Sequence, residues 1–157
     1  DDFFRYSKLQ GYVHDEGAAM LGGISGHAGL FSNSYEVAIV LQAMIQKGKY
    51  DDFKLFSQDS FDQFNFCYFC DKENRSGVGF DKPQIEGRHG STFGGVSSES
   101  FGHYGYTGSM AWADPDKNII FIFLSNRTYP TRENTLLQTS NTRTRSQEIV
   151  YKSLIDN

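Results

Sequence analysis

Long apolar runs and basic clusters are both missing from this chain of 157 residues. No apolar stretch approaches the ~20 residues that a membrane-spanning helix needs, so we expect no transmembrane segment. The formal net charge is −4 and the Lys and Arg residues are scattered, which argues against a nucleic-acid partner. Internal repeats, heptads and low-complexity tracts are also absent. A chain of this length and kind is typical of one ordinary domain.

Cysteine is scarce, since the chain has only Cys67 and Cys70. A C-x-x-C pair serves redox or metal chemistry in the right setting, but no second pair follows here and no strand-to-helix turn carries it. Aromatic neighbours, among them Phe66 and Phe69, favour a half-buried segment. We therefore interpret the two residues as packed or idle thiols.

The spacings typical of metal sites are missing too. The residues of suitable type are His14, Asp15, His27, His89 and His103. None of them forms an H-x-x-x-H pair or accompanies paired cysteines, which are the spacings that indicate zinc. We expect neither a metal nor an organic cofactor.

Aromatic residues, by contrast, make up 15% of the chain and supply apolar surface for a core. Residues 1–31 are rich in glycine, which predicts an irregular loop system. Asn33 and Glu36 predict a helix start, and the apolar stripe behind them ends at Gly48. The other expected elements are a helix from about Ser57 with Phe61 and Phe64 on one face, a short strand over 76–80, a loop over 86–100, and a helix over 143–155 with an apolar stripe of Ile149, Val150 and Leu154.

The clearest pattern is a strand hairpin near the middle of the chain. Bulky and small residues alternate from Tyr106 to Ala113, which predicts a strand with one bulky and one small face. A turn is expected over 114–118, where Asp and Pro favour one. The apolar run Ile119–Leu124 predicts a central strand that helices cover on both sides. Together these elements predict an α+β fold with antiparallel strands and an open sheet edge that favours a dimer.

A possible catalytic segment, His103-Tyr104-Gly105-Tyr106, stands at the start of this hairpin. A glycine lets an acyl group approach the backbone because no Cβ blocks it. The next backbone N–H, that of Tyr106, can then point at a developing oxyanion. His103 can shuttle a proton near neutral pH as an imidazole or bind a carboxylate as an imidazolium. The alternative for His103 is an ordinary surface position.

Further candidates for substrate binding lie after the apolar strand and near the N-terminus. Arg127 suits a carboxylate, and it can equally tie the last helix to the sheet through an ion pair with Glu133 or Glu148. His14 and Asp15 either line the pocket or tie their loop by hydrogen bonds. The expected substrate-binding residues are Tyr104, Gly105, Thr107, Asn126, Arg127, His14 and Asp15.

The order of these motifs resembles class C β-lactamases and related esterases, in which a K-T-G box stands where this chain has H-x-G. The motifs are Gly29-Leu30-Phe31-Ser32, the H-x-G box and Trp112-x-Asp114-Pro115, and the resemblance extends from Gly11 to Leu154. The segments 13–16 and 26–31 also resemble serine hydrolase domains that lie C-terminal to family-3 glycoside hydrolases of the β-N-acetylglucosaminidase type. The resemblance implies a partial β-lactamase/transpeptidase-like fold and acyl transfer through a serine ester.

The chain departs from this family at its first two motifs. No Ser has Lys three residues later, and no Tyr-x-Asn or Ser-x-Asn occurs. In the family these motifs precede the region matched here. We therefore expect residues 1–157 to form the C-terminal portion of one catalytic domain, inactive alone, whose partner is the N-terminal half that carries the nucleophile.

The expected substrate is an ester, a D-amino-acid peptide or amide, or a compound derived from the cell wall. The family resemblance implies a periplasmic or cell-envelope location. Two alternatives stay open: an accessory domain of a family-3 β-N-acetylglucosaminidase, and a non-catalytic binding module on the same scaffold.

Overall fold

The computed structural model describes residues 1, 3–72, 74–84 and 90–155, and it divides the chain into two compact units, residues 1–33 and 34–157. The first unit is irregular, as its glycine content predicts, apart from the short helix α1 (Glu16–Met20). The sequence pattern did not predict α1. Its N-cap is Asp15, whose carboxylate accepts a hydrogen bond from the N–H of Ala18 at 2.8 Å.

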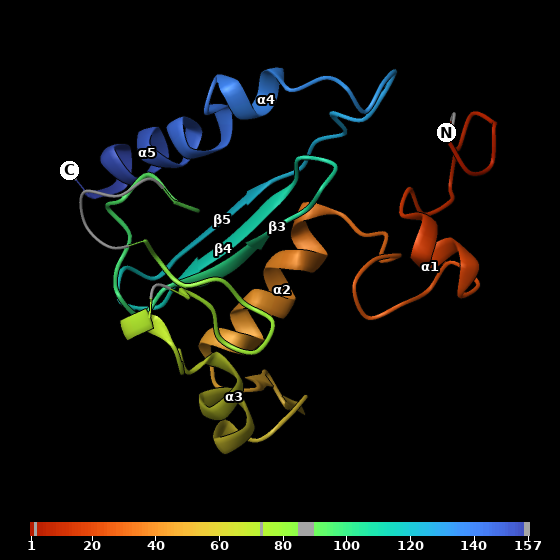
Figure 1. Cartoon of the computed structure of the whole chain (residues 1–157). Coiled ribbons are helices and arrows are strands. Elements are labelled where there is room, and N and C mark those ends of the chain that lie inside the picture. Colours follow the sequence, from red (N-terminus) through yellow and green to blue (C-terminus); the bar gives the residue numbers. More distant parts are fainter. Residues whose placement is uncertain (2, 73, 85–89, 156–157) are drawn as a thin grey trace. The chain divides into compact units, whose positions relative to one another are not determined.

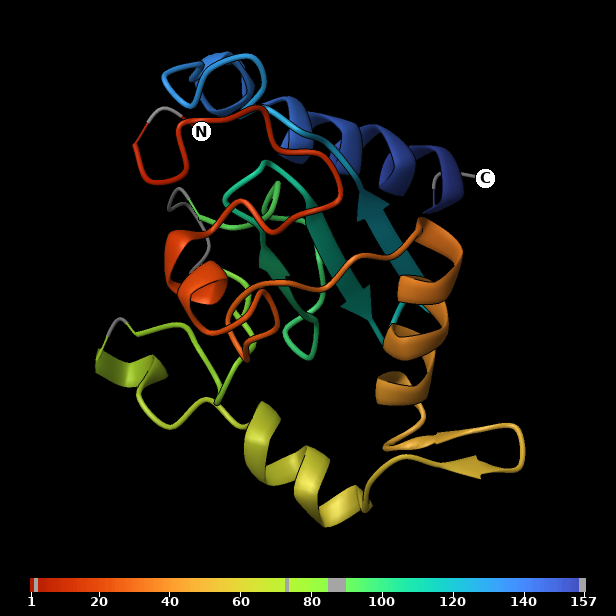
Figure 2. The ribbon, with the colours of Figure 1, turned by 90° about the vertical axis from the view of Figure 1, so that its right-hand side faces the viewer.

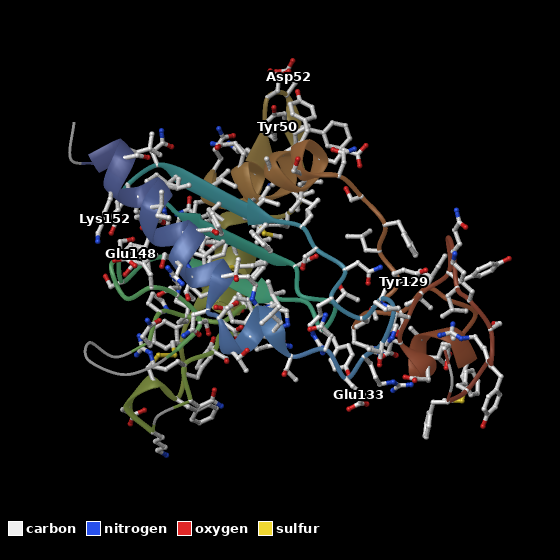
Figure 3. All side chains as sticks on the ribbon, turned by 90° about the horizontal axis from the view of Figure 1, so that it is seen from above. Tyr50, Asp52, Tyr129, Glu133, Glu148 and Lys152 are labelled. Carbon is white, nitrogen blue, oxygen red and sulfur yellow. A yellow bond between two sulfur atoms is a disulfide. The ribbon has the colours of Figure 1, made fainter. Side chains whose placement is uncertain are left out.

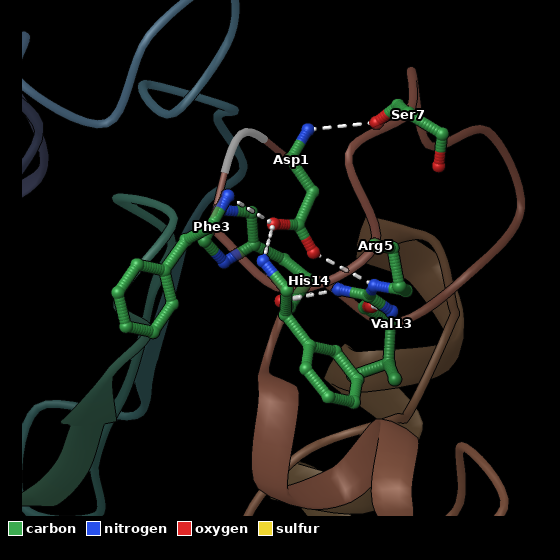
Figure 4. A network of polar contacts seen from close by, with 7 residues as sticks. Asp1, Phe3, Arg5, Ser7, Val13 and His14 are labelled. Carbon is green, nitrogen blue, oxygen red and sulfur yellow. Dashed lines mark hydrogen bonds and ion pairs between the residues drawn. The ribbon is translucent and has the colours of Figure 1, made fainter.

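An arginine holds the segment in front of α1. Arg5 donates to the carbonyls of Val13 at 2.7 Å and His14 at 2.8 Å, and its Nε pairs with Asp1 at 2.8 Å (Figure 4). These contacts give a glycine-rich stretch a fixed path although it has little secondary structure.

Among the described residues, the second unit contains all the strands and four of the five α-helices. Its elements are α2 (Ser34–Ile45), β1 (Lys49–Tyr50), β2 (Phe53–Lys54), α3 (Gln58–Asn65), η1 (Cys70–Lys72), β3 (Phe101–Tyr104), β4 (Met110–Asp114), β5 (Ile119–Phe123), α4 (Leu136–Thr139) and α5 (Thr142–Ile155) (Figure 1). The predicted α+β class, with antiparallel strands and a C-terminal helix, is confirmed.

The main sheet has the order β3-β4-β5, and both pairings are antiparallel. Trp112 at the centre of β4 lies opposite Gly102 on one side and Phe121 on the other. A Cβ on Gly102 would lie 2.4 Å from the Trp112 ring, so the fully buried indole requires a glycine there.

Helices cover both faces of this sheet, as the apolar sequence of β5 predicts (Figure 2). On one face Leu41 of α2 and Phe61 of α3 pack against Phe101 and Ala113. On the other face Val150 of α5 packs against a cluster that contains Trp112. The alternation of side chains along β4 therefore divides the core into two layers.

A buried carboxylate joins the second layer to the turn after β4. Asp114 is fully buried and accepts from the N–H of Ser97 at 2.9 Å, the N–H of Lys117 at 3.2 Å and the hydroxyl of Tyr151 at 3.1 Å. The Ser97 hydroxyl donates to it as well. A buried charge is tolerated when several donors satisfy it, and this network ties α5 to the sheet.

Three predicted elements need correction. The strand expected over Tyr106–Ala113 begins only at Met110, because residues 105–109 form a turn and His103 belongs to the preceding strand, β3. The strand expected over 76–80 is reduced to an isolated bridge between Ser76 and Asp81. On α3, Phe61 is buried as expected but Phe64 is exposed.

The buried face of α5 also differs from the prediction. Ile149 and Leu154 are exposed, whereas Gln147 and Tyr151 are buried. Both buried residues make hydrogen bonds, to the N–H of Phe93 and to Asp114, so polar residues fill positions that the apolar stripe alone did not identify.

Cys67 and Cys70 form a disulfide, so the interpretation as idle thiols is wrong. The bridge spans the short segment between α3 and η1, where the Cα atoms lie 5.5 Å apart.

None of the helices in the described ranges combines the length and apolarity that crossing a membrane requires.

Candidate active site

The candidate site is built around the turn that joins β3 to β4, residues 105–109. The N–H of Gly105 donates to the carbonyl of Ser109 at 2.8 Å, and the N–H of Gly108 donates to the carbonyl of Gly105 at 2.9 Å. Tyr106 stands within this turn rather than in a strand, and its side chain is exposed. The roles expected for His103 and for the Tyr106 N–H stay predictions.

His103 lies near the end of β3 with 63% of its side chain exposed. Its Nδ1 donates to the Asp81 carboxylate at 3.1 Å. Asp81 is 22 residues away in the sequence, and an isolated bridge places it opposite Gly102. The imidazole is therefore accessible and oriented at once.

Two glycines of the turn differ in what they permit. Gly108 has a φ of +100°, and a Cβ on it would lie 2.4 Å from Leu137 and 2.5 Å from Ser125, so the fold itself requires glycine. Gly105 has no such constraint, because the nearest atoms to an added Cβ are Ser109 and Thr107 at 3.6 and 3.7 Å. The absence of a side chain at Gly105 therefore leaves space above the backbone that this chain does not fill.

Arg127 supports the turn from the other side. Its Nε donates to the carbonyl of Tyr106 at 2.9 Å, and its guanidinium lies 4.5 Å from the centre of the Tyr106 ring. The backbone N–H of Arg127 donates to the carbonyl of Thr107 at 2.8 Å. Its Nη1 donates to the carbonyls of Arg132 and Asn134. The guanidinium is thus anchored to backbone carbonyls.

The alternative in which Arg127 forms an ion pair with Glu133 or Glu148 is wrong, because its guanidinium donates to backbone carbonyls instead. Among the described residues the guanidinium contacts backbone carbonyls and the Tyr106 ring, and Glu148 pairs with Lys152 one turn along α5 at 2.7 Å (Figure 3). A carboxylate-binding role for Arg127 stays a prediction.

Tyr104 packs into the sheet rather than toward His103, because successive side chains of a strand point to opposite faces. It belongs to the layer of Trp112, its hydroxyl donates to the carbonyl of Ser91, and the Arg143 guanidinium lies 4.2 Å from the centre of its ring. Burial raises the pKa of the Tyr104 phenol above its ordinary value, and Arg143 opposes this effect. These contacts hold the end of β3 in place.

An open pocket of about 510 Å³ adjoins the turn through Ser125 and Arg127. Ser125 donates from its hydroxyl to the carbonyl of Thr107 at 3.3 Å. Asn126, a predicted substrate-binding residue, is exposed and accepts from the Thr128 hydroxyl at 2.8 Å. The lining residues are Ser125, Asn126, Arg127, Asn134, Leu136, Leu137, Ser140 and Thr142.

His14 and Asp15 belong to the first unit, where they support their loop. The carbonyl of His14 accepts from Arg5, and Asp15 caps α1. Asp15 also accepts from Nε2 of His27 at 2.9 Å, while Nδ1 of His27 lies 2.9 Å from the Ser25 hydroxyl. The N–H of Ala18, and after it His27, lower the pKa of the Asp15 carboxyl below its ordinary value.

Within the described ranges, no group of three or more His, Cys, Asp and Glu side chains is placed to hold a metal ion. His89, one of the ligand types considered above, lies outside the described residues.

No sequence motif marks Asp81, Ser125 or Arg143 as a residue of this site. Asp81 lies far from the hairpin in sequence, and no local spacing connects it with His103. Ser125 contacts the turn through the carbonyl of Thr107, and Arg143 contacts the ring of Tyr104. Both contacts join segments that are distant in the sequence.

The family of the chain follows from comparison with known proteins. A family model described as "Beta-lactamase" matches residues 5–142. The chain therefore belongs to the β-lactamase family.

Curated proteins that are similar to this chain include two that align with 78% of its length. One, "Putative D-alanyl-D-alanine carboxypeptidase" of Escherichia coli (strain K12), is 38% identical over 128 residues, which are 78% of this chain and 28% of that protein. Another of the same name from Salmonella enteritidis PT4 is 35% identical over 127 residues, with the same shares of 78% and 28%. The chain thus matches just over a quarter of the length of these relatives. They give no support for a glycoside hydrolase fusion, and no solved structure matches the chain.

Proposed function

We propose that this chain forms one wall of a serine acyl-transfer site that acts on peptides ending in D-alanyl-D-alanine, with the attacking hydroxyl supplied by polypeptide outside these 157 residues. Family membership and the names of the relatives support this reaction class. In this site His103 exchanges a proton with the reacting groups, and the backbone N–H of Tyr106 stabilises the oxyanion.

Gly105 is the observation that carries the proposal. Neither its φ nor its neighbours in the chain require glycine, in contrast to Gly108 in the same turn. The open space above Gly105 lies two residues from the exposed imidazole of His103. An acyl group that approaches the backbone at this point reaches both groups.

The nucleophile must come from elsewhere, because no Ser of the chain has Lys three residues later. The chain covers only 28% of the relatives' length, which leaves ample polypeptide to carry that motif. A peptide substrate of this kind belongs to the cell wall, so we place the protein in the cell envelope. A non-catalytic module is the competing hypothesis, and the coding sequence upstream of Asp1 distinguishes the two by the presence or absence of Ser-x-x-Lys.

Gly105→Ala in the full-length protein tests the proposal. The methyl group fits within the chain, so the stability of the variant is expected to stay within about 0.5 kcal/mol of wild type or rise slightly. It occupies the space of the acyl group, so kcat/KM for release of D-alanine is expected to fall about 100-fold.

Asp116→Asn, in the exposed turn after β4, serves as a matched control and should change neither quantity. Gly108→Ala should instead destabilise the fold, because a Cβ there collides with Leu137. Unchanged turnover in Gly105→Ala, with a stable fold, would reject the proposed approach of the substrate.

A further inference from the structure

We propose that Asp81 is a positioning residue that holds His103 in its Nδ1–H tautomer and leaves Nε2 to exchange the proton. This inference rests on the proposed function of the His103 site, and its test separates the two. A carboxylate only accepts hydrogen bonds, so the contact of 3.1 Å between Nδ1 and Asp81 requires the proton on Nδ1. In a neutral imidazole the lone pair then belongs to Nε2.

The backbone fixes Asp81 where this role needs it. Its N–H donates to the carbonyl of Gly102 at 2.8 Å, and its carbonyl accepts from the N–H of Gly102 at 3.1 Å. This reciprocal pair places Asp81 beside the strand position that precedes His103. The Ser76 hydroxyl lies 3.4 Å from the other carboxylate oxygen.

The Asp81 side chain is less exposed than that of His103, as expected for a residue that positions an accessible ring. The Asp81 side chain is 27% exposed, whereas that of His103 is 63% exposed. Among the residues that the structure describes, Asp81 is the side chain that bonds the ring, so Nε2 stays accessible to a ligand. The Asp81 carboxylate thus engages Nδ1, and Nε2 is left for the ligand.

A second histidine–aspartate pair in the chain shows the contrasting arrangement. His27 donates from Nε2 to Asp15, and its Nδ1 accepts from the Ser25 hydroxyl. Both ring nitrogens of His27 are engaged, and its carboxylate partner also caps α1. That pair holds a loop, whereas the pair of Asp81 and His103 keeps one nitrogen available.

The tautomers can be read from ¹⁵N spectra of the imidazole rings, which report which nitrogen carries the proton. We expect His103 to be protonated on Nδ1 and His27 on Nε2 in the same sample, at a pH above the ordinary imidazole titration. The His103→Gln variant assigns the signals. Asp81→Asn, whose amide can donate to Nδ1, should move the His103 proton to Nε2, while Asp116→Asn should leave it unchanged. A wild-type His103 protonated on Nε2 would overturn the inference without any variant.

Turnover of the D-alanyl-D-alanine peptide by the full-length protein supplies the second readout. Asp81→Asn should lower kcat about 10- to 100-fold with little change in KM. If His103→Ala abolishes turnover while Asp81→Asn alters neither tautomer nor kcat, the role of Asp81 is wrong and the proposed function stands. If Asp81 sets the tautomer but His103→Ala leaves turnover intact, the positioning is right and the proposed function is wrong.

Discussion

Removing the Tyr151 hydroxyl tests the network that fastens α5 to the sheet behind the candidate site. Tyr151 is 2% exposed, and its hydroxyl donates to Asp114 at 3.1 Å. In Tyr151→Phe the ring keeps its position and its contact with Phe93, whose ring centre lies 5.0 Å away. The change therefore removes one hydrogen bond and opens no cavity.

The size of the effect follows from the charge of the acceptor. A hydrogen bond to a charged group contributes about 1.5–3 kcal/mol, and the remaining donors from Ser97 and Lys117 keep Asp114 from being left unsatisfied. The free energy of unfolding should fall by that amount. For a chain of this size the loss corresponds to roughly 3–12 °C in Tm.

The pH dependence gives an independent check of the same contact. Burial, and then Asp114, raise the pKa of the Tyr151 phenol above its ordinary value near 10. Above pH 10 the unfolded chain therefore loses a proton that the folded chain keeps, so the unfolding free energy of wild type falls as the pH rises. The variant lacks this group, and its deficit relative to wild type should shrink above pH 10.

Urea unfolding followed by circular dichroism measures both quantities. Tyr35→Phe is the matched control, because Tyr35 is 73% exposed on α2 and its loss should cost less than about 0.5 kcal/mol. A loss in Tyr151→Phe no larger than that of the control would refute the reasoning about the buried network.

Two further predictions concern the second unit. Lys82 is 7% exposed, and burial lowers the pKa of its ammonium. Between that lowered pKa and the ordinary value of ~10.4, the unfolded chain holds a proton that the folded chain has released. In urea titrations the unfolding free energy of wild type should therefore rise relative to that of Lys82→Met from pH 7 to pH 10. A flat difference over that range would show that Lys82 is solvated. Within the described residues no strand pairs with the outer edge of β5, so sedimentation equilibrium of this chain is expected to show association that grows with concentration. A monomer at the highest concentration would contradict association through the edge of β5.

The sequence predicted the elements whose signals are local. The helix α2 follows a capping pattern and an apolar stripe, and β5 is an unbroken apolar run, so both were found near their true bounds. The strand β4 was placed too early, because the alternation from Tyr106 onward continues through a turn. That turn depends on the positive φ of Gly108 and on hydrogen bonds from Arg127, about 20 residues later in the chain.

The candidate site was predicted in part for the same reason. His103 and Gly105 form a short motif that the sequence displays. The partner of His103, Asp81, comes from a segment with no regular structure, and an isolated bridge brings it there. The buried positions of Gln147 and Tyr151 likewise depend on partners 54 and 37 residues away.

The most direct measurement of the central claim compares this chain alone with the same chain joined to the N-terminal half that we propose carries the nucleophile. Hydrolysis of p-nitrophenyl acetate and nitrocefin is recorded for both, each with and without His103→Ala. We expect no saturable turnover by the 157 residues alone and turnover by the joined protein that His103→Ala abolishes. Saturable turnover by the isolated chain, lost in His103→Ala, would show that the attacking group lies within these residues and would contradict the account.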